Sequence, residues 1–315
     1  MHVLNSDIEL VIAVATCNRA AQLRTLLGTL GRQQDAPRFG VVVVDNSAAH
    51  QDVGLTCLED LPPAIRSVSV YETHPIPGIP SVRNQLVHAA WRHFPSMRWL
   101  AMVDDDEWLP PDWLANIVRA AELTSADVVC GPQIYKATAA APAWFNSVQA
   151  LVNQYPEQRK PIEFGLSTGN VLFRAELFRS LTAPWFDPVF TRSGGSDFDF
   201  FLRAAVSGAK TVFEPQAVTY EDCHGARLTP EWWRERMQKY GRNHARVLRR
   251  NHTKPEFVRR SLFIASNTAL SIPWRYLKPR AADPAVCAWM RTAWLKGFLS
   301  GCIAEPLPRR ESYGN

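Results

Sequence analysis

Three aspartates stand in a row, Asp104-Asp105-Asp106, and Glu107 follows them directly. Adjacent carboxylates repel one another and resist ionising together, so a divalent cation would relieve the repulsion. Mg²⁺ and Mn²⁺ favour carboxylate and phosphate oxygens, and such an ion commonly keeps one or two carboxylates and takes its other ligands from phosphates and water. The run therefore predicts a site for a metal and a phosphate. The structural alternative is an acidic turn or a helix N-cap.

A second group of candidates lies in residues 194–200, which contain two glycines and two further aspartates. Glycine lets a backbone approach a ligand closely. Asp197 beside an aromatic segment is suited to act as a general base toward an acceptor hydroxyl. The alternative is that Ser196 or Asp197 caps the helix expected from residue 198, and both roles can coexist.

Isolated polar residues add weaker candidates. Asp45 could accept hydrogen bonds from a base or ribose, or could simply form a turn with its neighbours. His224 could supply a nitrogen to a metal or bind phosphate, although a lone histidine is more often structural or exposed. Four basic residues could neutralise a leaving diphosphate, the alternative being a solvated helix face. These are Arg234, Arg236, Lys239 and Arg242.

Uniformly apolar runs separated by helix-like segments must position these residues. This pattern implies an α/β fold with a mostly parallel sheet covered on both faces. Ligands bind such sheets beyond the carboxyl ends of the strands, and polar clusters follow several of the runs directly. The expected strands are 8–14, 41–44, 67–71 and 99–103, the expected helices include 20–30 and 81–93, and the clusters are 16–19, 45–47 and 104–106.

Composition bounds the function classes. The 315 residues are 46% hydrophobic and carry a net charge of +5, which suits a solvated surface or anionic partners such as diphosphates and anionic lipid. We expect no nucleic-acid partner, because no zinc-finger, basic-zipper or RNA-binding signature is present. The chain also lacks a phosphate loop, a dinucleotide-binding glycine motif and a nucleophile elbow. Scattered cysteines and the absence of a signal-peptide pattern predict a cytoplasmic location.

The last part of the chain changes character. Residues 231–250 are rich in arginine and lysine, and residues 256–303 mix aromatic, aliphatic and basic positions. A basic amphipathic helix with aromatics can lie on the inner face of the cell membrane, or it can form a helical cap on a catalytic domain; periodicity does not separate the two. We predict a catalytic domain over residues 1–250 and a basic, aromatic helical extension over 251–315.

Taken together, the clusters resemble the family 2 glycosyltransferases with the GT-A fold, and most closely the bacterial exopolysaccharide (succinoglycan-type) glucosyltransferases. The resemblance covers residues 8 to about 245 and rests on short motifs in the family's order. They are Ala15-Thr16-Cys17-Asn18-Arg19, Val44-Asp45-Asn46-Ser47, Ser81-Val82-Arg83-Asn84, Val103-Asp104-Asp105-Asp106-Glu107, Ser167-Thr168-Gly169-Asn170 and Gly194-Gly195-Ser196-Asp197-Phe198-Asp199.

The resemblance implies a role for each motif. Asp104 and Asp106 would form the D-x-D element, and Asp197 would be the catalytic base of an inverting displacement. Asp106 would hold a divalent metal, Mn²⁺ or Mg²⁺, and His224, a candidate from the sequence itself, is the other predicted metal ligand. The donor, most commonly a UDP-sugar in this family, would meet Thr16, Asn18, Arg19, Asp45, Arg83, Asp104, Asp105 and Asp106. The acceptor or its loop would involve Thr168, Gly169, Asn170, Gly195, Ser196 and Asp199.

One position departs from the family pattern. Where the family usually has Gly-Gly-Glu-Asp, this chain has Ser196 before Asp197. Two alternatives to a sugar transferase acting on a carbohydrate or lipid-linked acceptor stay open. One is a sugar-nucleotide nucleotidyltransferase, which would be expected to carry a glycine-rich basic loop after the first strand. The other is a non-catalytic nucleotide-sugar-binding or scaffold protein, which the change at Ser196 would suit.

Overall fold

The computed structural model describes residues 7–47, 53–137, 141–163, 165, 167–277 and 283–308. The chain forms two compact units. The first comprises Met1–Tyr135, Tyr155–Thr191 and Ser196–Asp222. The second comprises Lys136–Gln154, Arg192–Gly195 and Cys223–Asn315.

A central sheet organises the first unit, in the strand order β3-β2-β1-β4-β9-β6-β10-β8. The pairs β1–β2, β1–β4, β2–β3 and β6–β10 are parallel, whereas β9 runs antiparallel to β4 and β6, and β8 runs antiparallel to β10. The expected mostly parallel sheet is therefore confirmed. The strands are β1 (Leu10–Thr16), β2 (Phe39–Asp45), β3 (Ser69–Thr73), β4 (Trp99–Asp104), β6 (Val128–Cys130), β8 (Lys160–Pro161), β9 (Asn170–Arg174) and β10 (Thr211–Phe213).

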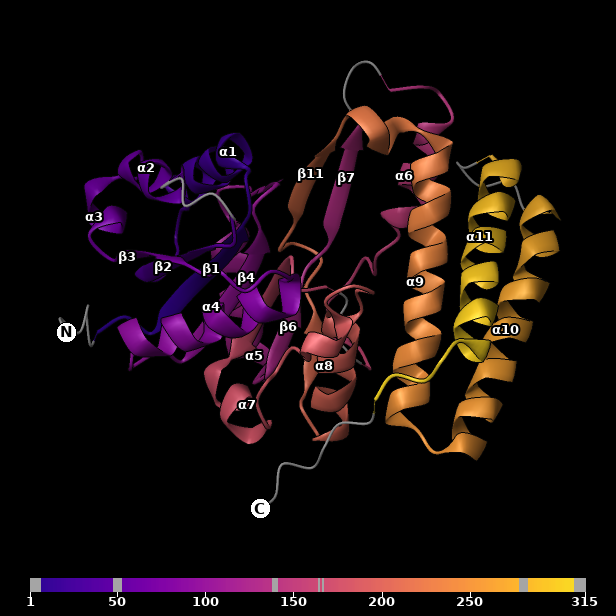
Figure 1. Cartoon of the computed structure of the whole chain (residues 1–315). Coiled ribbons are helices and arrows are strands. Elements are labelled where there is room, and N and C mark those ends of the chain that lie inside the picture. The colour runs from indigo at the N-terminus through magenta and orange to yellow at the C-terminus, as the bar shows by residue number, and fades with distance from the viewer. Residues whose placement is uncertain are drawn as a thin grey trace. The chain divides into compact units, whose positions relative to one another are not determined.

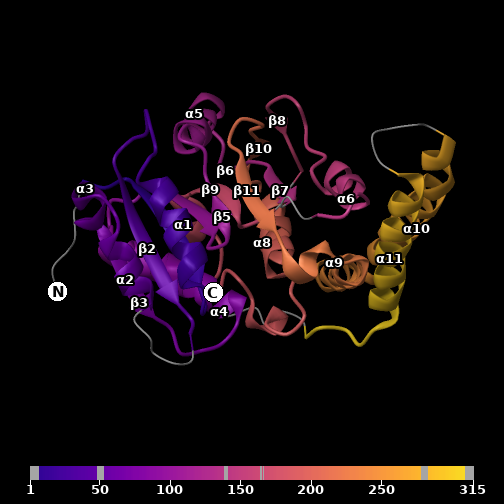
Figure 2. The same ribbon diagram turned by 90° about the horizontal axis from the view of Figure 1, so that it is seen from above.

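Helices cover both faces of this sheet, because successive side chains of a strand point to opposite faces. In β1, Leu10, Ile12 and Val14 pack toward α1 (Ala20–Leu30), α2 (Val53–Glu59) and α5 (Trp113–Thr124). The alternate residues Val11 and Ala13 belong to the other core, with α4 (Ile79–His93), α7 (Ala175–Ser180) and α8 (Ser196–Val206) (Figures 1 and 2). Burial on both faces explains why the strand sequences are continuously apolar.

Several short elements lie outside the central sheet. The helix α3 (Pro63–Arg66) precedes β3, and the turn η1 (Pro188–Phe190) precedes the segment that leads to α8. A separate three-stranded sheet has the order β5-β11-β7, with β5 (Glu107–Trp108), β7 (Gln133–Ala137) and β11 (Thr219–Cys223). The sequence did not predict this small sheet, because its strands are short and mostly polar.

The second unit is helical. It contains α6 (Phe145–Val152), η2 (Gly225–Leu228), α9 (Pro230–Asn251), α10 (Lys254–Leu277) and α11 (Pro284–Ile303). The helices α9 and α11 lie against each other and α10 packs on α11 (Figures 1 and 2). A Cβ at Gly241 would come within 2.0 Å of the Trp294 carbonyl oxygen, and one at Gly297 within 2.0 Å of that of Gln238. Glycines thus permit backbone contact between α9 and α11.

Residue 250 lies at the end of α9, and α9 belongs to the same compact unit as the C-terminal helices; the division into a catalytic domain and an extension stays a prediction. Among the described residues, no helix is both long and apolar enough to cross a membrane.

Candidate active site

The register of the central sheet brings three of the predicted clusters to one edge. Thr16 at the end of β1 stands opposite Asp45 at the end of β2, and Ala15 stands opposite Asp104 at the end of β4. The antiparallel strand β9 begins at the same edge, because Asn170 pairs with Val103. The structure therefore gathers residues from four separate motifs beyond the carboxyl ends of the parallel strands.

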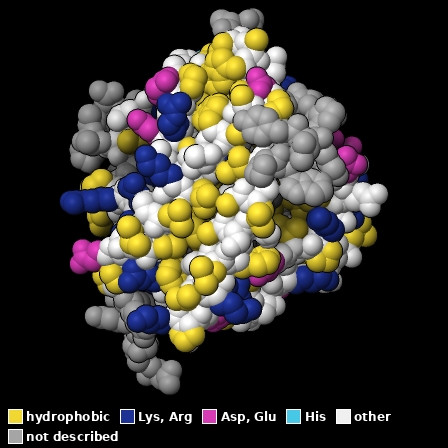
Figure 3. Space-filling model, turned by 90° about the vertical axis from the view of Figure 1, so that its right-hand side faces the viewer, with side chains coloured by type: hydrophobic (Ala, Val, Ile, Leu, Met, Phe, Trp, Pro, Cys, Tyr) yellow, Lys and Arg dark blue, Asp and Glu magenta, His cyan; other side chains and the backbone are white. Residues whose placement is uncertain are grey.

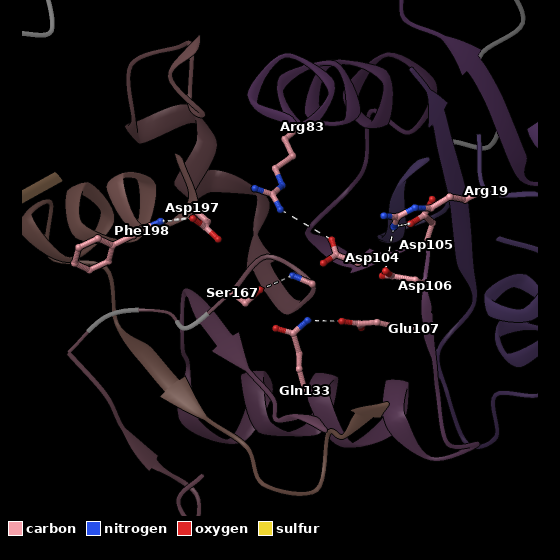
Figure 4. Close-up of polar contacts among 11 residues, drawn as sticks. Arg19, Arg83, Asp104, Asp105, Asp106, Glu107, Gln133, Ser167, Asp197 and Phe198 are labelled. Carbon is pink, nitrogen blue, oxygen red and sulfur yellow. Dashed lines mark hydrogen bonds and ion pairs between the residues drawn. The ribbon is translucent and has the colours of Figure 1, made fainter. Parts of the chain in front are cut away.

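The three aspartates of the acidic run have different partners. Asp105 is buried and accepts a hydrogen bond from Thr16 Oγ1 at 2.8 Å. Arg19 Nη1 bridges Asp105 Oδ1 at 2.9 Å and Asp106 Oδ2 at 3.0 Å. Asp104 points elsewhere, and its Oδ1 lies 4.0 Å from Arg83 Nη2 (Figure 4). One arginine therefore holds Asp105 and Asp106, while another faces Asp104.

Carboxylates outnumber the cations at this point, and the pKa values reflect the excess. The pKa of Asp104 is raised to about 6, chiefly by burial; Arg83 opposes the rise, and the charges of Asp106, Asp105 and Asp197 add to it. Burial also raises the pKa of Glu107 well above its usual value. Asp104 nevertheless keeps 45% of its side-chain surface exposed, so its carboxylate is open to a ligand. An added cation would stabilise the ionised forms.

A divalent metal fits this donor set. Hard cations prefer carboxylate oxygens. Asp104 and Asp106 offer such oxygens at this edge of the sheet, where carboxylates are in excess. No group of three or more His, Cys, Asp or Glu side chains is arranged to hold a metal among the residues with assigned positions. The protein would thus supply one or two ligands, and phosphate and water the rest. His224, the other predicted ligand, belongs to the second unit, and its role stays a prediction.

Gly169 fits tightly against this acidic cluster. A Cβ at Gly169 would lie 2.2 Å from Gln133 Nε2, 2.7 Å from Asp104 Oδ2 and 2.8 Å from Glu107 Oε1. Any side chain larger than hydrogen would displace these groups. Gln133 donates a hydrogen bond to Glu107, and the Gly169 N–H donates to Ser167 Oγ at 3.1 Å (Figure 4). The glycine is therefore required by close approach to the acidic cluster.

The two neighbours of Gly169 have different surroundings. Asn170 is buried, donates to the Pro132 and Ala217 carbonyls and accepts from Trp113 Nε1, which assigns its polar atoms to the fold. Thr168 is also buried, and its Oγ1 has no hydrogen-bond partner among the described residues. Of these three predicted positions, Gly169 directly borders the acidic cluster.

Asp197 lies in the first turn of α8, close enough for its charge to raise the pKa of Asp104. Its Oδ1 accepts the Phe198 N–H at 2.9 Å, and its carboxylate lies on the same side of the site as Arg83 (Figure 4). Ser196 before it is buried as the first residue of α8. Asp199 is buried and its Oδ2 pairs with Arg203 Nε at 2.9 Å, which assigns that carboxylate to the packing of α8. Gly195 belongs to the second unit.

Two residues that were predicted to meet the donor, Asn18 and Asp45, belong to a connected polar shell. Asp45 is buried and accepts hydrogen bonds from the Ser47 N–H at 2.8 Å and from Tyr71 OH at 2.9 Å. Ser47 Oγ accepts the N–H of Asn18, which has a positive φ of 55°. Asp45 therefore organises the loops after β1 and β2, and its direct contact with a nucleoside stays a prediction.

Sequence reasoning missed part of this shell. Asn46 Oδ1 accepts the Gly78 N–H at 3.1 Å, and its Nδ2 donates to the His74 and Ile76 carbonyls. These bonds fix the entry to α4, the helix that carries Arg83. Tyr71 and Gln133 were missed as well, because their partners Asp45 and Glu107 are distant in sequence. No local pattern marks such pairs.

The comparisons with known proteins agree with this geometry. The model described as "Glycosyl transferase family 2" matches residues 11–182, and the one described as "Glycosyl transferase family group 2" matches residues 99–308. The chain is 29% identical over 245 residues to the succinoglycan biosynthesis protein ExoM of Rhizobium meliloti (strain 1021), covering 78% of this chain and 76% of that protein.

Solved structures are similar in fold. The mannosyltransferase PcManGT from Pyrobaculum calidifontis, in complex with GDP-Man and Mn²⁺, matches with a TM-score of 0.60 at 17% identity, over 95% of this chain and 88% of that one. Residues 1–349 of S. aureus TarS, in complex with UDP-GlcNAc, match with a TM-score of 0.53 at 15% identity, over 93% and 91%. Against a longer TarS chain, this chain spans 55% of the length.

These likenesses establish the GT-A fold for the mostly parallel sheet and its flanking helices. The family models cover more than half of the chain, including the strands that end at Thr16, Asp45 and Asp104. The chain belongs to glycosyl transferase family 2 and is similar to exopolysaccharide biosynthesis enzymes.

Proposed function

We propose that this chain is an inverting, metal-dependent glycosyltransferase that moves a sugar from a nucleotide-sugar donor, a UDP-sugar by preference, to a hydroxyl of a glycan or lipid-linked glycan. The observation that carries the proposal is that Asp104, Arg83 and Asp197 converge at one edge of the sheet (Figure 4). Its place is polysaccharide or glycoconjugate biosynthesis, in line with the named role of the Rhizobium relative.

The donor diphosphate would lie between Asp104 and the two arginines. Arg19 and Arg83 would neutralise part of its charge by charge-assisted hydrogen bonds. Arg19 is bound to Asp105 and Asp106 in the free protein, so donor binding would draw it toward phosphate oxygens. A divalent metal held by Asp104 and Asp106 would supply further stabilisation of the negative charge on the leaving diphosphate.

Asp197 would take the proton of the acceptor hydroxyl as that oxygen attacks the anomeric carbon. The new C–O bond forms while the bond from the anomeric carbon to the diphosphate oxygen breaks, and the nucleoside diphosphate leaves with the electron pair. One displacement from the opposite side inverts the anomeric configuration. Asp199 is tied to Arg203 and is poorly placed for this role.

Screening nucleotide sugars for thermal stabilisation tests the donor class. We expect one UDP-sugar, with Mn²⁺ or Mg²⁺ present, to raise the melting temperature by roughly 5 °C or more at a large excess over its Kd, because a ligand of the folded state stabilises it by mass action. GDP-sugars and dTDP-sugars are the matched comparison set. If no nucleotide sugar stabilised the folded protein with either metal, the proposal would be wrong.

Peripheral membrane association is part of the same proposal and is supported by α10. Its exposed apolar side chains include Leu262, Phe263 and Leu270, each 64–67% exposed. Residues 257–277 contain no Asp or Glu and include three arginines. Figure 3 shows hydrophobic side chains spread over this face with Lys and Arg among them. An apolar and basic helix face is suited to an anionic membrane surface.

Vesicle co-sedimentation tests this surface. The wild-type protein is expected to sediment with phosphatidylglycerol vesicles more than with phosphatidylcholine vesicles, because anionic lipid attracts its basic residues. Leu262→Ser combined with Phe263→Ser should reduce sedimentation several-fold, since each loses the free energy of burying a large apolar side chain. Leu123→Ser, an equally exposed leucine on α5, is the control. Equal sedimentation of all these proteins would contradict the membrane role.

A further inference from the structure

The second unit contains a pocket that none of the proposed donor residues lines. Its volume is about 510 Å³, and its walls are the segment Arg192–Ser193 and one face of α9. On α9 the lining residues recur at intervals of three and four positions, as one side of a helix requires. They are Glu235, Gln238, Lys239, Arg242, Asn243 and Arg246. A pocket of this size is within the range of small-molecule sites.

The pocket is strongly cationic. Four basic side chains, from Arg192, Lys239, Arg242 and Arg246, surround it against the single carboxylate of Glu235. In the part of the chain that the structure describes, Arg246 Nε is buried and has no hydrogen-bond partner. Arg242 Nε donates a hydrogen bond to Ser300 Oγ at 3.3 Å. Crowded cations without partner carboxylates favour an anionic ligand.

The wall formed by Arg192–Ser193 is held in place on α9. Asn243 Nδ2 donates to the Ser193 carbonyl oxygen at 2.7 Å. Gly194 follows with a φ of +77°, and a Cβ there would lie 3.1 Å from Asn243 Nδ2 and 3.3 Å from Lys239 Cε. Glycine is needed for both its backbone conformation and its close contact with the pocket residues. The pocket is therefore built by the segment that leads directly into the proposed base.

The position of this segment in the chain indicates which substrate the pocket serves. The proposed donor residues Asp104, Asp106, Arg19 and Arg83 all belong to the first unit. The pocket belongs to the second unit. Its wall Arg192–Ser193 is connected through Gly194 and Gly195 to Asp197 of the first unit, which would receive the acceptor proton. An anion held by Arg192 and α9 is thus associated with the acceptor rather than with the donor.

We propose that this pocket binds the diphosphate group of a phosphorylated acceptor, such as a glycan carried on a lipid diphosphate. The proposal rests on the proposed sugar transfer and names its acceptor class. Arginine forks match phosphate oxygens in pairs. Arg246 lines the pocket, and its buried Nε has no hydrogen-bond partner among the described residues. The remaining volume accommodates the groups attached to the diphosphate.

Calorimetric titration with geranyl diphosphate and with inorganic pyrophosphate tests the pocket. The titrations are made in the presence of a chelator, so that metal-dependent binding at the donor site does not contribute. Wild-type protein is expected to bind both probes, with affinity that falls as salt is added. Arg246→Gln and Lys239→Gln should each weaken binding by roughly 10-fold or more, as expected for hydrogen bonds to a charged group. Arg119→Gln, an exposed arginine on α5, is the charge-matched control.

Three results would overturn the proposal. The first is no metal-free diphosphate binding by folded wild-type protein, or equal binding by the two pocket variants. The second is a matching loss of UDP binding in Arg246→Gln with Mn²⁺ present, which would assign the pocket to the donor. The third is that Arg246→Gln no longer binds phosphatidylglycerol vesicles while it binds geranyl diphosphate as the wild type does. That result would assign the pocket to lipid headgroups. Thermal stabilisation of the wild-type protein by nucleotide sugars reports the proposed function separately.

Discussion

Replacing Asp197 with alanine is expected to abolish sugar transfer while the nucleotide still binds. Removing a general base costs about 10²–10⁴-fold in rate, because the acceptor hydroxyl then keeps its proton as it attacks. Among the described residues, the Asp197 side chain accepts a hydrogen bond from its neighbour Phe198 N–H, at 2.9 Å, and a contact this local should leave the fold intact when it is lost. Turnover is measured as nucleoside diphosphate release with donor and acceptor, and binding by calorimetry.

Two further variants sharpen this experiment. Asp197→Asn keeps the shape of the side chain and removes the base, so it should resemble Asp197→Ala. Asp197→Glu restores a carboxylate on a longer arm and should recover part of the rate without changing nucleotide affinity. Wild-type turnover in Asp197→Ala would contradict the base assignment. A folded wild-type protein that binds donor but never transfers sugar would instead support the non-catalytic alternative that Ser196 leaves open.

Removing the carboxylate of Asp104 or Asp106 is expected to abolish metal-dependent donor binding. Asp104→Asn and Asp106→Ala should each weaken UDP binding in Mn²⁺ by roughly 10-fold or more, since a metal ligand and its charge are lost. Glu122→Gln, which removes one exposed carboxylate on α5, should bind as wild type does. Calorimetry with Mn²⁺ and with a chelator makes the comparison. Equal UDP affinity of the wild type in both conditions would rule out the metal role.

The same site predicts a pH dependence. A metal binds the ionised carboxylate, and the pKa of Asp104 is raised to about 6 by burial and by neighbouring carboxylates. Metal-dependent UDP binding should therefore weaken by roughly 10-fold per pH unit below 6, as protons compete with the cation. In Asp104→Asn this steep decline should disappear. If the wild type bound UDP in the presence of metal with the same affinity at pH 7 and at pH 5, the predicted pH dependence would be wrong.

The pKa of Asp104 also affects the metal-free protein in the opposite sense. Because the folded-state pKa exceeds the ordinary value of 3.8, the folded protein binds more protons than the unfolded chain between these values. The contribution of Asp104 to stability is then present at low pH and is lost as pH rises through about 6. A bound cation at neutral pH would offset this loss, which links metal binding to the stability of the site.

Much of the architecture follows from the sequence. Continuous apolar runs predicted the first strands, and the helices expected at 20–30 and 198–206 were found as α1 and most of α8. The reason is local: buried strands and amphipathic helices must show their burial as periodic apolar residues. The small sheet of β5, β11 and β7 has no such signal, because its strands are short and pair across distant parts of the chain.

The sequence alone identified the candidate site residues, because their chemistry resides in residue types and spacing. They lie in the acidic run, the Gly-Gly-Ser-Asp segment and the polar ends of the strands. Only the tertiary structure separated Asp104 from Asp105 and Asp106, through Arg83 on one side and Arg19 on the other. It also tied Asp199 to Arg203 and placed Gly169 against Asp104. These assignments depend on contacts between residues far apart in the chain or on burial, and no local pattern records either.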